Sequence, residues 1–272
     1  MTPLLQVIGL SKAFSGVRAV QQASFEIETG SITGLIGPNG SGKTTTIDCI
    51  SGFQHIDSGR VLLAGAEITN LRPAIVARAG LIRTFQNVRV YDSYNLIDNL
   101  MIAEAPFRGL NWYDALVRTR AFCAARMAAE NRARELIDLV GLIGLVDAPA
   151  VVLSYGQKKL LAFAAAMMSR PKLIVLDEPV AGVNPARINE VGRMLRTANQ
   201  AGMSFLIVEH NVEFINSLCH KVIVFEQGSK LTEGTPDQVR NDPRVLDAYL
   251  GVAPAPPVRA AKAVRWNIPN WS

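Results

Sequence analysis

The chain has 272 residues, of which 49% are apolar and 19% are charged, and its formal net charge is +5. This composition excludes a disordered chain, and no apolar run approaches the roughly 18 residues that a membrane-spanning helix needs. The three cysteines, Cys49, Cys123 and Cys219, are widely separated, which argues against a disulfide framework or a zinc site and favours a reducing cytosol.

Short apolar runs alternate with helical patterns at both ends of the chain. Runs rich in β-branched residues predict strands at Leu4–Leu10, Ala23–Ile27, Ser31–Ile36, Arg60–Leu63, Ile82–Phe85, Leu173–Leu176, Phe205–Val208 and Lys221–Phe225. Helices are predicted at Lys43–Ile50, Pro185–Asn199 and Pro236–Leu250. This alternation indicates an α/β fold with a largely parallel sheet, because parallel neighbours need crossover helices.

The middle of the chain lacks strand patterns. Stretches rich in Ala, Leu and Arg predict helices there at Leu96–Ala103, Tyr113–Val140 and Tyr155–Met168. We therefore expect a helical subdomain at about 87–168, inserted into a core formed by residues 1–86 and 169–252.

The last residues, 253–272, begin with a Pro-rich run and carry Arg259, Lys262 and Arg265 without an acidic side chain. This composition predicts an extended or disordered basic appendage. Contact with anionic lipid, docking on protein and a dispensable tail remain open alternatives for it.

A glycine-rich loop joins the predicted strand Ser31–Ile36 to the predicted helix Lys43–Ile50. Glycines let backbone N–H groups converge on phosphate oxygens, and the helix adds its positive N-terminal end. We expect Lys43 to reach the β- and γ-phosphates, the Thr44 hydroxyl to bind Mg²⁺, and Thr45 to contribute to the nucleotide site. The residues that match the pattern G-x-x-x-x-G-K-[ST] are Gly37, Pro38, Asn39, Gly40, Ser41, Gly42, Lys43 and Thr44.

Two carboxylates follow the apolar strand Leu173–Leu176. Asp177 is placed to bind Mg²⁺, directly or through water. Glu178 is the candidate base that orients and deprotonates an attacking water. Such a pair alone is common in solvated loops, but together with a phosphate-binding loop it points to ATP hydrolysis with Mg²⁺.

Between these motifs, Leu153-Ser154-Tyr155-Gly156-Gln157 resembles the signature motif of ABC (ATP-binding cassette) ATPases, whose usual form is LSGGQ. The resemblance implies a P-loop NTPase (RecA-like) core with an antiparallel β subdomain and an inserted α-helical subdomain. In that family the signature loop binds the γ-phosphate of the ATP held by the opposite subunit, which gives Ser154, Gly156 and Gln157 this role. Tyr155 departs from the commoner glycine.

Further family elements follow in the expected order. Phe14 resembles the aromatic residue that stacks on adenine; a core position for Phe14 and a contact shared with Val20 remain alternatives. Gln86 resembles the glutamine that touches Mg²⁺ and senses the membrane partner. The segment Ala181–Asn184 resembles the loop at the dimer interface, with Asn184 replacing the common Asp. His210 resembles the histidine that contacts the γ-phosphate. The resemblance thus implies that Glu178, His210, Lys43 and Gln86 are catalytic, and that Thr44, Gln86 and Asp177 bind the metal.

Three features are similar to the ATPases of branched-chain amino-acid importers: the run Arg83–Arg89, the LSYGQ form of the signature, and the run Ala181–Pro185. The C-terminal Gly234-Thr235-Pro236 and Tyr249-Leu250-Gly251 are also similar. Cassettes serving urea or amide uptake, or lipopolysaccharide export, remain alternatives. A soluble, non-transport ABC ATPase is less favoured, because such proteins usually carry two cassettes or a long coiled-coil insertion.

The resemblance also implies partners and a location. Two cassettes, either two copies of this chain or this chain and a paralogue, would sandwich two ATP–Mg²⁺. Integral membrane permease subunits would dock on the pair, and a periplasmic or extracellular binding protein would act indirectly. We expect a peripheral protein on the cytoplasmic face of the inner membrane, with no nucleic acid among its partners.

Overall fold

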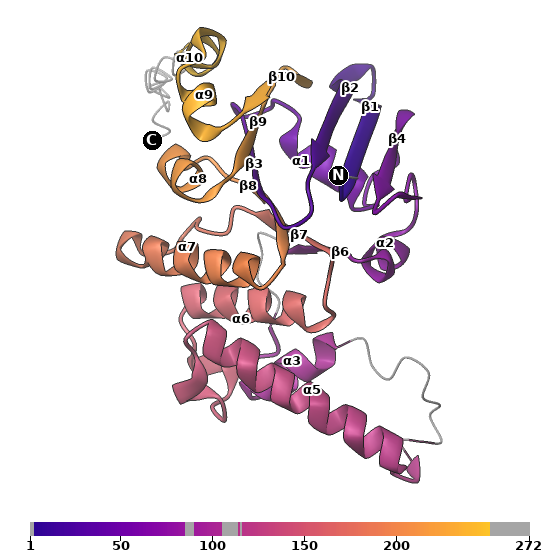
Figure 1. Cartoon of the computed structure of the whole chain (residues 1–272), viewed down its shortest axis with the longest axis vertical. Coiled ribbons are helices and arrows are strands. Elements are labelled where there is room, and N and C mark those ends of the chain that lie inside the picture. Colours follow the sequence, from indigo (N-terminus) through magenta and orange to yellow (C-terminus); the bar gives the residue numbers. More distant parts are fainter. Residues whose placement is uncertain (1–2, 85–89, 105–113, 115, 251–272) are drawn as a thin grey trace, which may run out of the picture.

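The computed structural model describes residues 3–84, 90–104, 114 and 116–250 of the chain (Figure 1). These residues form a six-stranded sheet, a four-stranded sheet and helices that cover both, which confirms the predicted α/β fold. Within the same residues, no helix combines the length and the apolar character needed to cross a membrane.

The four-stranded sheet is antiparallel and has the order β2-β1-β4-β5. A tight turn joins β1 (Leu5–Phe14) to β2 (Val17–Ile27) through Ser15 and Gly16, which have φ angles of 45° and 86°. Two positive φ angles suit a two-residue hairpin, because they match the twist of the paired strands. The sheet continues through β4 (Ser58–Leu63) to the two-residue β5 (Ala66–Glu67).

The six-stranded sheet has the order β10-β9-β3-β8-β7-β6, and all its strands are parallel except β10. All five residues of β3 are buried, as expected for a central strand that is covered on both faces. The strand bounds are β3 Ile32–Ile36, β6 Leu81–Thr84, β7 Leu173–Asp177, β8 Ser204–Val208, β9 Lys221–Glu226 and β10 Ser229–Gly234.

Two apolar clusters lie on opposite faces of this sheet. On one face, Leu35 of β3 packs in a cluster with α1 (Lys43–Ile50), α2 (Pro73–Ala79) and the antiparallel sheet. On the other face, Ile32 and Ile36 pack in a cluster with the remaining helices. These include α7 (Pro185–Gln200), α8 (Val212–Leu218), α9 (Pro236–Arg240) and α10 (Pro243–Leu250). Successive side chains of β3 therefore pack into both clusters and join the two halves of the core.

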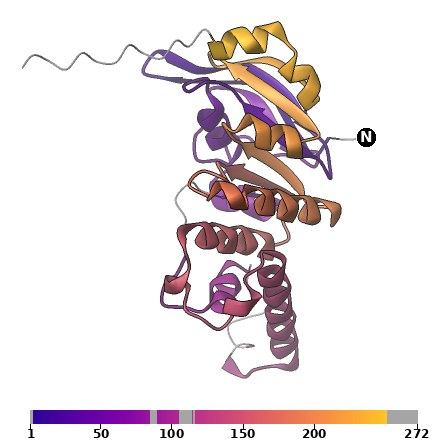
Figure 2. The same cartoon turned by 90° about the vertical axis from the view of Figure 1, so that its left-hand side faces the viewer.

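The helices α3 (Leu96–Ala103), α5 (Arg120–Leu139) and α6 (Tyr155–Met168) form the lower part of the molecule in Figure 1. Figures 1 and 2 show α6 beside α7, with α3 and α5 on the far side of α6. Two short 3₁₀ turns, Ile143–Leu145 and Ala150–Val152, lead back toward α6. Arg132 of α5 donates to the Met167 carbonyl at 2.9 Å, which fastens α5 to α6. That this part is a separate inserted subdomain stays a prediction.

Several predicted elements differ from the structure. The predicted helix Pro236–Leu250 is two helices, because Pro243 cannot donate a backbone N–H and Asp242 caps a new start by accepting from the Arg244 N–H at 3.0 Å. The predicted helix Tyr113–Val140 is interrupted: Asp114 and Leu116 are helical, and α5 begins at Arg120 after Arg118, with φ of 51°, and the capping Thr119. The elements α2, α8, β5 and β10 were not predicted. The helices Lys43–Ile50, Leu96–Ala103 and Tyr155–Met168 are confirmed.

Asn99 fixes the segment that precedes α3. Its side chain, which is 6% exposed, accepts from the Tyr91 N–H at 2.8 Å and donates to the carbonyls of Tyr91 and Asn95 at 3.0 and 2.9 Å. We predict that Asn99→Ala lowers the free energy of unfolding by about 1–3 kcal/mol, because buried backbone groups lose their partners. Urea denaturation measures this. The exposed Asn241→Ala should change it by less than about 0.5 kcal/mol, and equal effects would contradict the prediction.

Candidate nucleotide site

The loop between β3 and α1 requires glycine at two close approaches. A Cβ atom on Gly37 would lie 2.1 Å from the Phe225 carbonyl oxygen, and one on Gly42 would lie 2.4 Å from that of Ala19. Both glycines also have positive φ angles, 150° and 94°. The loop is thus wedged against neighbouring backbone, which holds it in the shape that phosphate binding requires.

Lys43 begins α1 and is folded into this loop. Its ammonium group donates to the Gly37 and Pro38 carbonyls at 2.8 and 2.9 Å, and the residue is 5% exposed. Burial lowers the pKa of Lys43, while the charges of Glu178 and Asp177 act in the opposite direction. The lysine charge is therefore held at the loop, facing the two carboxylates.

The carboxyl ends of β7 and β8 bring the predicted hydrolytic residues to the same place. Glu178 Oε1 lies 3.3 Å from His210 Nε2. A pocket of about 240 Å³ is lined by the loop, Asp177, Glu178 and His210. The loop residues that line it are Asn39, Gly40, Ser41, Gly42, Lys43, Thr44 and Thr45. Gly37 and Pro38 complete the loop as the acceptors of Lys43. The carboxyl ends of the parallel strands thus bring the glycine-rich loop and the carboxylates into one pocket.

Glu209 fixes the backbone around this pair. It is 4% exposed and accepts from the Val180 N–H at 2.9 Å and the His210 N–H at 3.0 Å. Glu178 itself has φ of 50° and donates its N–H to the Val208 carbonyl at 2.9 Å. Because a positive φ is strained for glutamate, these bonds help to hold the backbone of Glu178 in this conformation.

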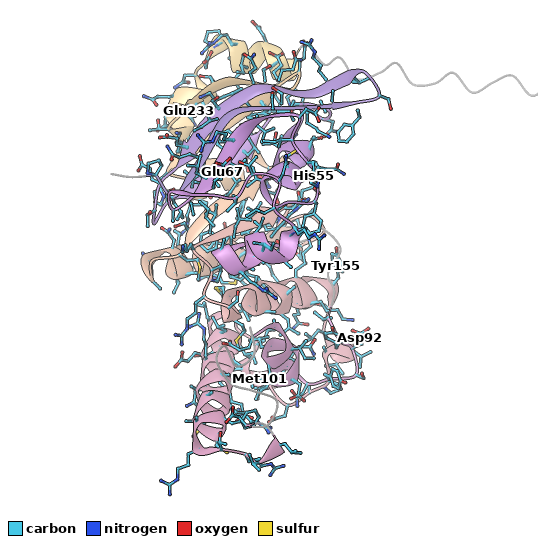
Figure 3. All side chains as sticks on the ribbon, turned by 90° about the vertical axis from the view of Figure 1, so that its right-hand side faces the viewer. His55, Glu67, Asp92, Met101, Tyr155 and Glu233 are labelled. Carbon is cyan, nitrogen blue, oxygen red and sulfur yellow. The ribbon has the colours of Figure 1, made fainter. Side chains whose placement is uncertain are left out.

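The signature segment forms the start of α6. Ser154 accepts from the Gln157 N–H at 3.3 Å and donates its own N–H to Gln157 Oε1 at 2.9 Å, so the two residues make a reciprocal cap. Tyr155 is 51% exposed, and Figure 3 shows it at the edge of the molecule on the same side as Asp92. The helix N-terminus is left open toward solvent, where it can receive an anion.

Ser154, Gly156 and Gln157 do not join the pocket of the phosphate loop. They line a separate hollow of about 760 Å³ together with Gly182, Val183 and Asn184 and with residues of α7. Within one chain the phosphate loop and the signature segment therefore line different pockets.

Phe14 and Gln86 are the two remaining predicted residues of the site. Phe14, at the end of β1, is 42% exposed, with the Lys12 ammonium 5.2 Å from its ring centre, so it is a surface residue rather than a core one. Gln86 lies outside the described residues. His220, which matched no motif, accepts from the Ile32 N–H at 2.9 Å and is a structural residue.

Sequence reasoning missed several residues that support the site. Glu209 follows an apolar strand and adjoins His210, which is a signal that could have identified it. Lys159 of α6 donates to the Glu178 and Ala181 carbonyls at 3.0 and 2.5 Å and so links the signature helix to the hydrolytic segment. Burial lowers the pKa of Lys159, partly offset by Glu209 and Glu178. Lys159 lies four residues after Tyr155 in the sequence, and this position does not indicate a contact with Glu178 or Ala181.

Tyr249 of α10 reaches the first residue of the phosphate loop. Burial raises the pKa of Tyr249 to about 12, and a hydrogen bond with the backbone of Gly37 opposes this shift. A hydrogen bond that lowers the pKa of a phenol is one that its oxygen accepts, so the Gly37 N–H is the donor. The C-terminal helix is thereby in contact with the nucleotide loop.

The chain matches two family profiles. Residues 20–181 match the profile described as ABC transporter. The chain belongs to the ABC transporter family. Residues 229–255 of the cassette also match the profile of the branched-chain amino acid ATP-binding cassette transporter. A cassette of this fold binds nucleotide, which agrees with the pocket at the phosphate loop.

Curated relatives and solved structures agree with this assignment. The cassette is 35% identical to the high-affinity branched-chain amino acid transport ATP-binding proteins BraF of Pseudomonas aeruginosa and LivG of Escherichia coli K12, over 92% of this chain and 99% of each relative. A solved ATP-binding cassette of an ABC transporter in its ADP conformation is 31% identical, with a TM-score of 0.79, over 92% of this chain and 100% of the other. A nucleotide-free cassette is 31% identical, with a TM-score of 0.78, over 91% and 99%.

We predict that Phe14→Ala weakens ADP and ATP binding by about 1–3 kcal/mol, because an aromatic face for adenine is lost. Isothermal titration calorimetry measures the affinity. The melting temperature should change little, since the side chain is 42% exposed. Ile8→Ala, on the same strand and 48% exposed, serves as the matched control. An unchanged nucleotide affinity in Phe14→Ala would show that the ring does not stack on adenine.

We predict that Tyr249→Phe lowers the free energy of unfolding of the nucleotide-free cassette by about 1–3 kcal/mol. Phenylalanine keeps the ring and its packing but removes the oxygen that accepts from Gly37. Urea denaturation provides the measurement. Tyr94→Phe, which alters a hydroxyl on a side chain that is 48% exposed, should have no measurable effect. Equal stability of the two variants would mean that the hydroxyl of Tyr249 does not brace the loop.

Proposed function

We propose that the chain is the ATP-hydrolysing subunit of an ABC importer for branched-chain amino acids. The observation that carries the hydrolytic part is the pocket that the phosphate loop, Asp177, Glu178 and His210 line together. The substrate class rests on the C-terminal profile and on the printed names of the relatives. The cassette itself supplies the motor, and membrane and binding proteins select the solute.

Each residue of the pocket has a role that its chemistry supports. Backbone N–H groups of the loop and the Lys43 ammonium bind the phosphates, and Lys43 leaves its carbonyl partners to do so. The Glu178 carboxylate takes a proton from the attacking water. His210, at 3.3 Å from Glu178, orients that carboxylate and contacts the γ-phosphate. Gln86 completes the set by resemblance.

Mg²⁺ fits the oxygen donors at this pocket. The exposed Thr44 hydroxyl and the Asp177 carboxylate are hard oxygen ligands, and Mg²⁺ commonly takes one or two such protein ligands beside phosphate and water. When bound, the ion neutralises negative charge on the phosphates. We assign Thr44 and Asp177 to hold it, with Gln86 as a further ligand.

The separation of the phosphate-loop pocket from the hollow of the signature segment supports a pair of cassettes. The signature residues Ser154, Gly156 and Gln157 line a hollow of their own, and none of them lines the pocket of the phosphate loop, so we assign them to a nucleotide bound by another cassette. A second copy of this chain or a paralogue would supply the missing half. Closure around two ATP–Mg²⁺ then drives permease subunits in the membrane, with the cassettes bound peripherally at its cytoplasmic face.

The experiment is reconstitution of the cassette with its permease subunits in liposomes, with Glu178→Gln as the test variant. We predict that hydrolysis and leucine uptake fall by about 10²–10⁴-fold while ATP binding is retained, because the amide fills the same space but cannot accept the proton. Glu213→Gln, an exposed carboxylate on α8, is the matched control and should behave as wild type.

Two results would contradict the proposal. Near-wild-type hydrolysis by Glu178→Gln would remove the assignment of the base. Uptake of urea or another amide, but not of leucine, isoleucine or valine, by the active wild-type complex would leave the ATPase intact and exclude the substrate class.

A further inference from the structure

Arg83 joins the proposed metal-binding carboxylate to the helix that follows the phosphate loop. Its guanidinium donates through Nη2 to Asp177 Oδ2 at 2.9 Å and through Nη1 to Asp48 Oδ1. Asp177 ends β7, Asp48 lies on α1, and Arg83 itself lies on β6. One side chain therefore connects three elements that meet beside the nucleotide pocket.

The contact is shielded from water. The side chain of Arg83 is 7% exposed, and those of Asp177 and Asp48 are 13% and 28% exposed. The guanidinium carbon of Arg83 also lies over the Phe53 ring, 5.8 Å from its centre. Charges in such surroundings are screened less than surface pairs, so their geometry is held firmly.

The geometry suits arginine in particular. A guanidinium presents separate N–H groups in a planar fork and can hold two carboxylates at once, whereas a lysine ammonium is a point charge on a flexible stem. One oxygen of Asp177 is engaged by Arg83, which leaves its other oxygen for a second partner. The hydrogen bond from Arg83 thus restricts the rotamer of Asp177.

We infer that Arg83 is a positioning residue for Mg²⁺: it orients the Asp177 carboxylate toward the metal–nucleotide, and Asp48 holds Arg83 in place. The inference rests on the proposed function, since it takes Asp177 as a metal ligand. Groups that orient a metal ligand from behind typically change metal affinity by 10–100-fold when they are removed.

Coulomb attraction and orientation predict opposite effects of removing Arg83. Loss of a positive charge beside Asp177 would by itself strengthen the binding of a cation. Loss of orientation weakens it. If the variant needs less Mg²⁺ than wild type for the half-maximal effect, Arg83 acts only as a charge. If the variant needs more Mg²⁺, Arg83 positions the carboxylate.

The test measures binding of a fluorescent ADP analogue to the full chain in a Mg²⁺ titration, with parallel measurements in EDTA. We predict that Arg83→Met raises the Mg²⁺ concentration for half-maximal effect by about tenfold while affinity in EDTA is unchanged. Arg83→Lys should fall between wild type and Arg83→Met. Asp48→Asn should cause a smaller shift in the same direction, and no further shift when combined with Arg83→Met.

Arg60→Met is the matched control, because Arg60 also pairs with a carboxylate, Glu67, but its side chain is 59% exposed on β4. Its Mg²⁺ requirement should equal that of wild type. A wild-type Mg²⁺ requirement in Arg83→Met would overturn the inference. So would an equal loss of affinity in EDTA and in Mg²⁺, because that pattern describes a general loss of structure.

Asp177→Asn separates this inference from the function on which it rests. If Asp177→Asn leaves the Mg²⁺ requirement unchanged, the proposed metal ligand is wrong, and the inference fails with it. If Asp177→Asn raises the requirement and Arg83→Met does not, the metal ligand stands and only the role of Arg83 is overturned.

Discussion

Parallel pairing of β3 with β8, and of β8 with β7, places three distant parts of the chain at one edge of the sheet. Because all three strands run the same way, their carboxyl ends open on the same side. The phosphate loop follows β3, Asp177 and Glu178 follow β7, and Glu209 and His210 follow β8. The pairing depends in turn on a core that covers both faces of these strands, so the chemistry and the stability of the chain share the same hydrogen bonds.

The residues that surround the edge connect it to the rest of the chain. Lys159 joins the signature helix to the Glu178 carbonyl, Arg83 joins β6 to Asp177, and Tyr249 joins α10 to Gly37. Each contact comes from a different element and reaches a different part of the pocket. A displacement of any of these elements therefore reaches the groups that would handle the nucleotide.

The sequence predicted the residues of the candidate site better than the residues that hold them in place. Apolar runs that end in carboxylates, and a glycine loop between strand and helix, are local patterns, so β3, β7 and α1 could be found without a structure. The contacts of Arg83, Lys159 and Tyr249 depend on packing between segments 19 to 212 residues apart, which no local pattern records. The two-residue β5 and the short helices α2 and α8 are stabilised by their neighbours rather than by their own residue preferences. Pro243 and Thr119 are local signals for the two breaks in the predicted helices Pro236–Leu250 and Tyr113–Val140, but the helix-forming composition on both sides of each break concealed them.

The contact between Tyr249 and Gly37 bears on where this chain can be shortened. Tyr249 lies among the last residues that the structure describes, yet it contacts Gly37 in the phosphate loop after β3. A fragment produced by proteolysis within β10 or α9 would keep every residue of the phosphate loop, Asp177, Glu178 and His210 and still lack one of the braces of that loop. The smallest fragment that preserves the site as it stands must therefore extend through α10, some forty residues beyond His210, the last residue of the proposed catalytic set.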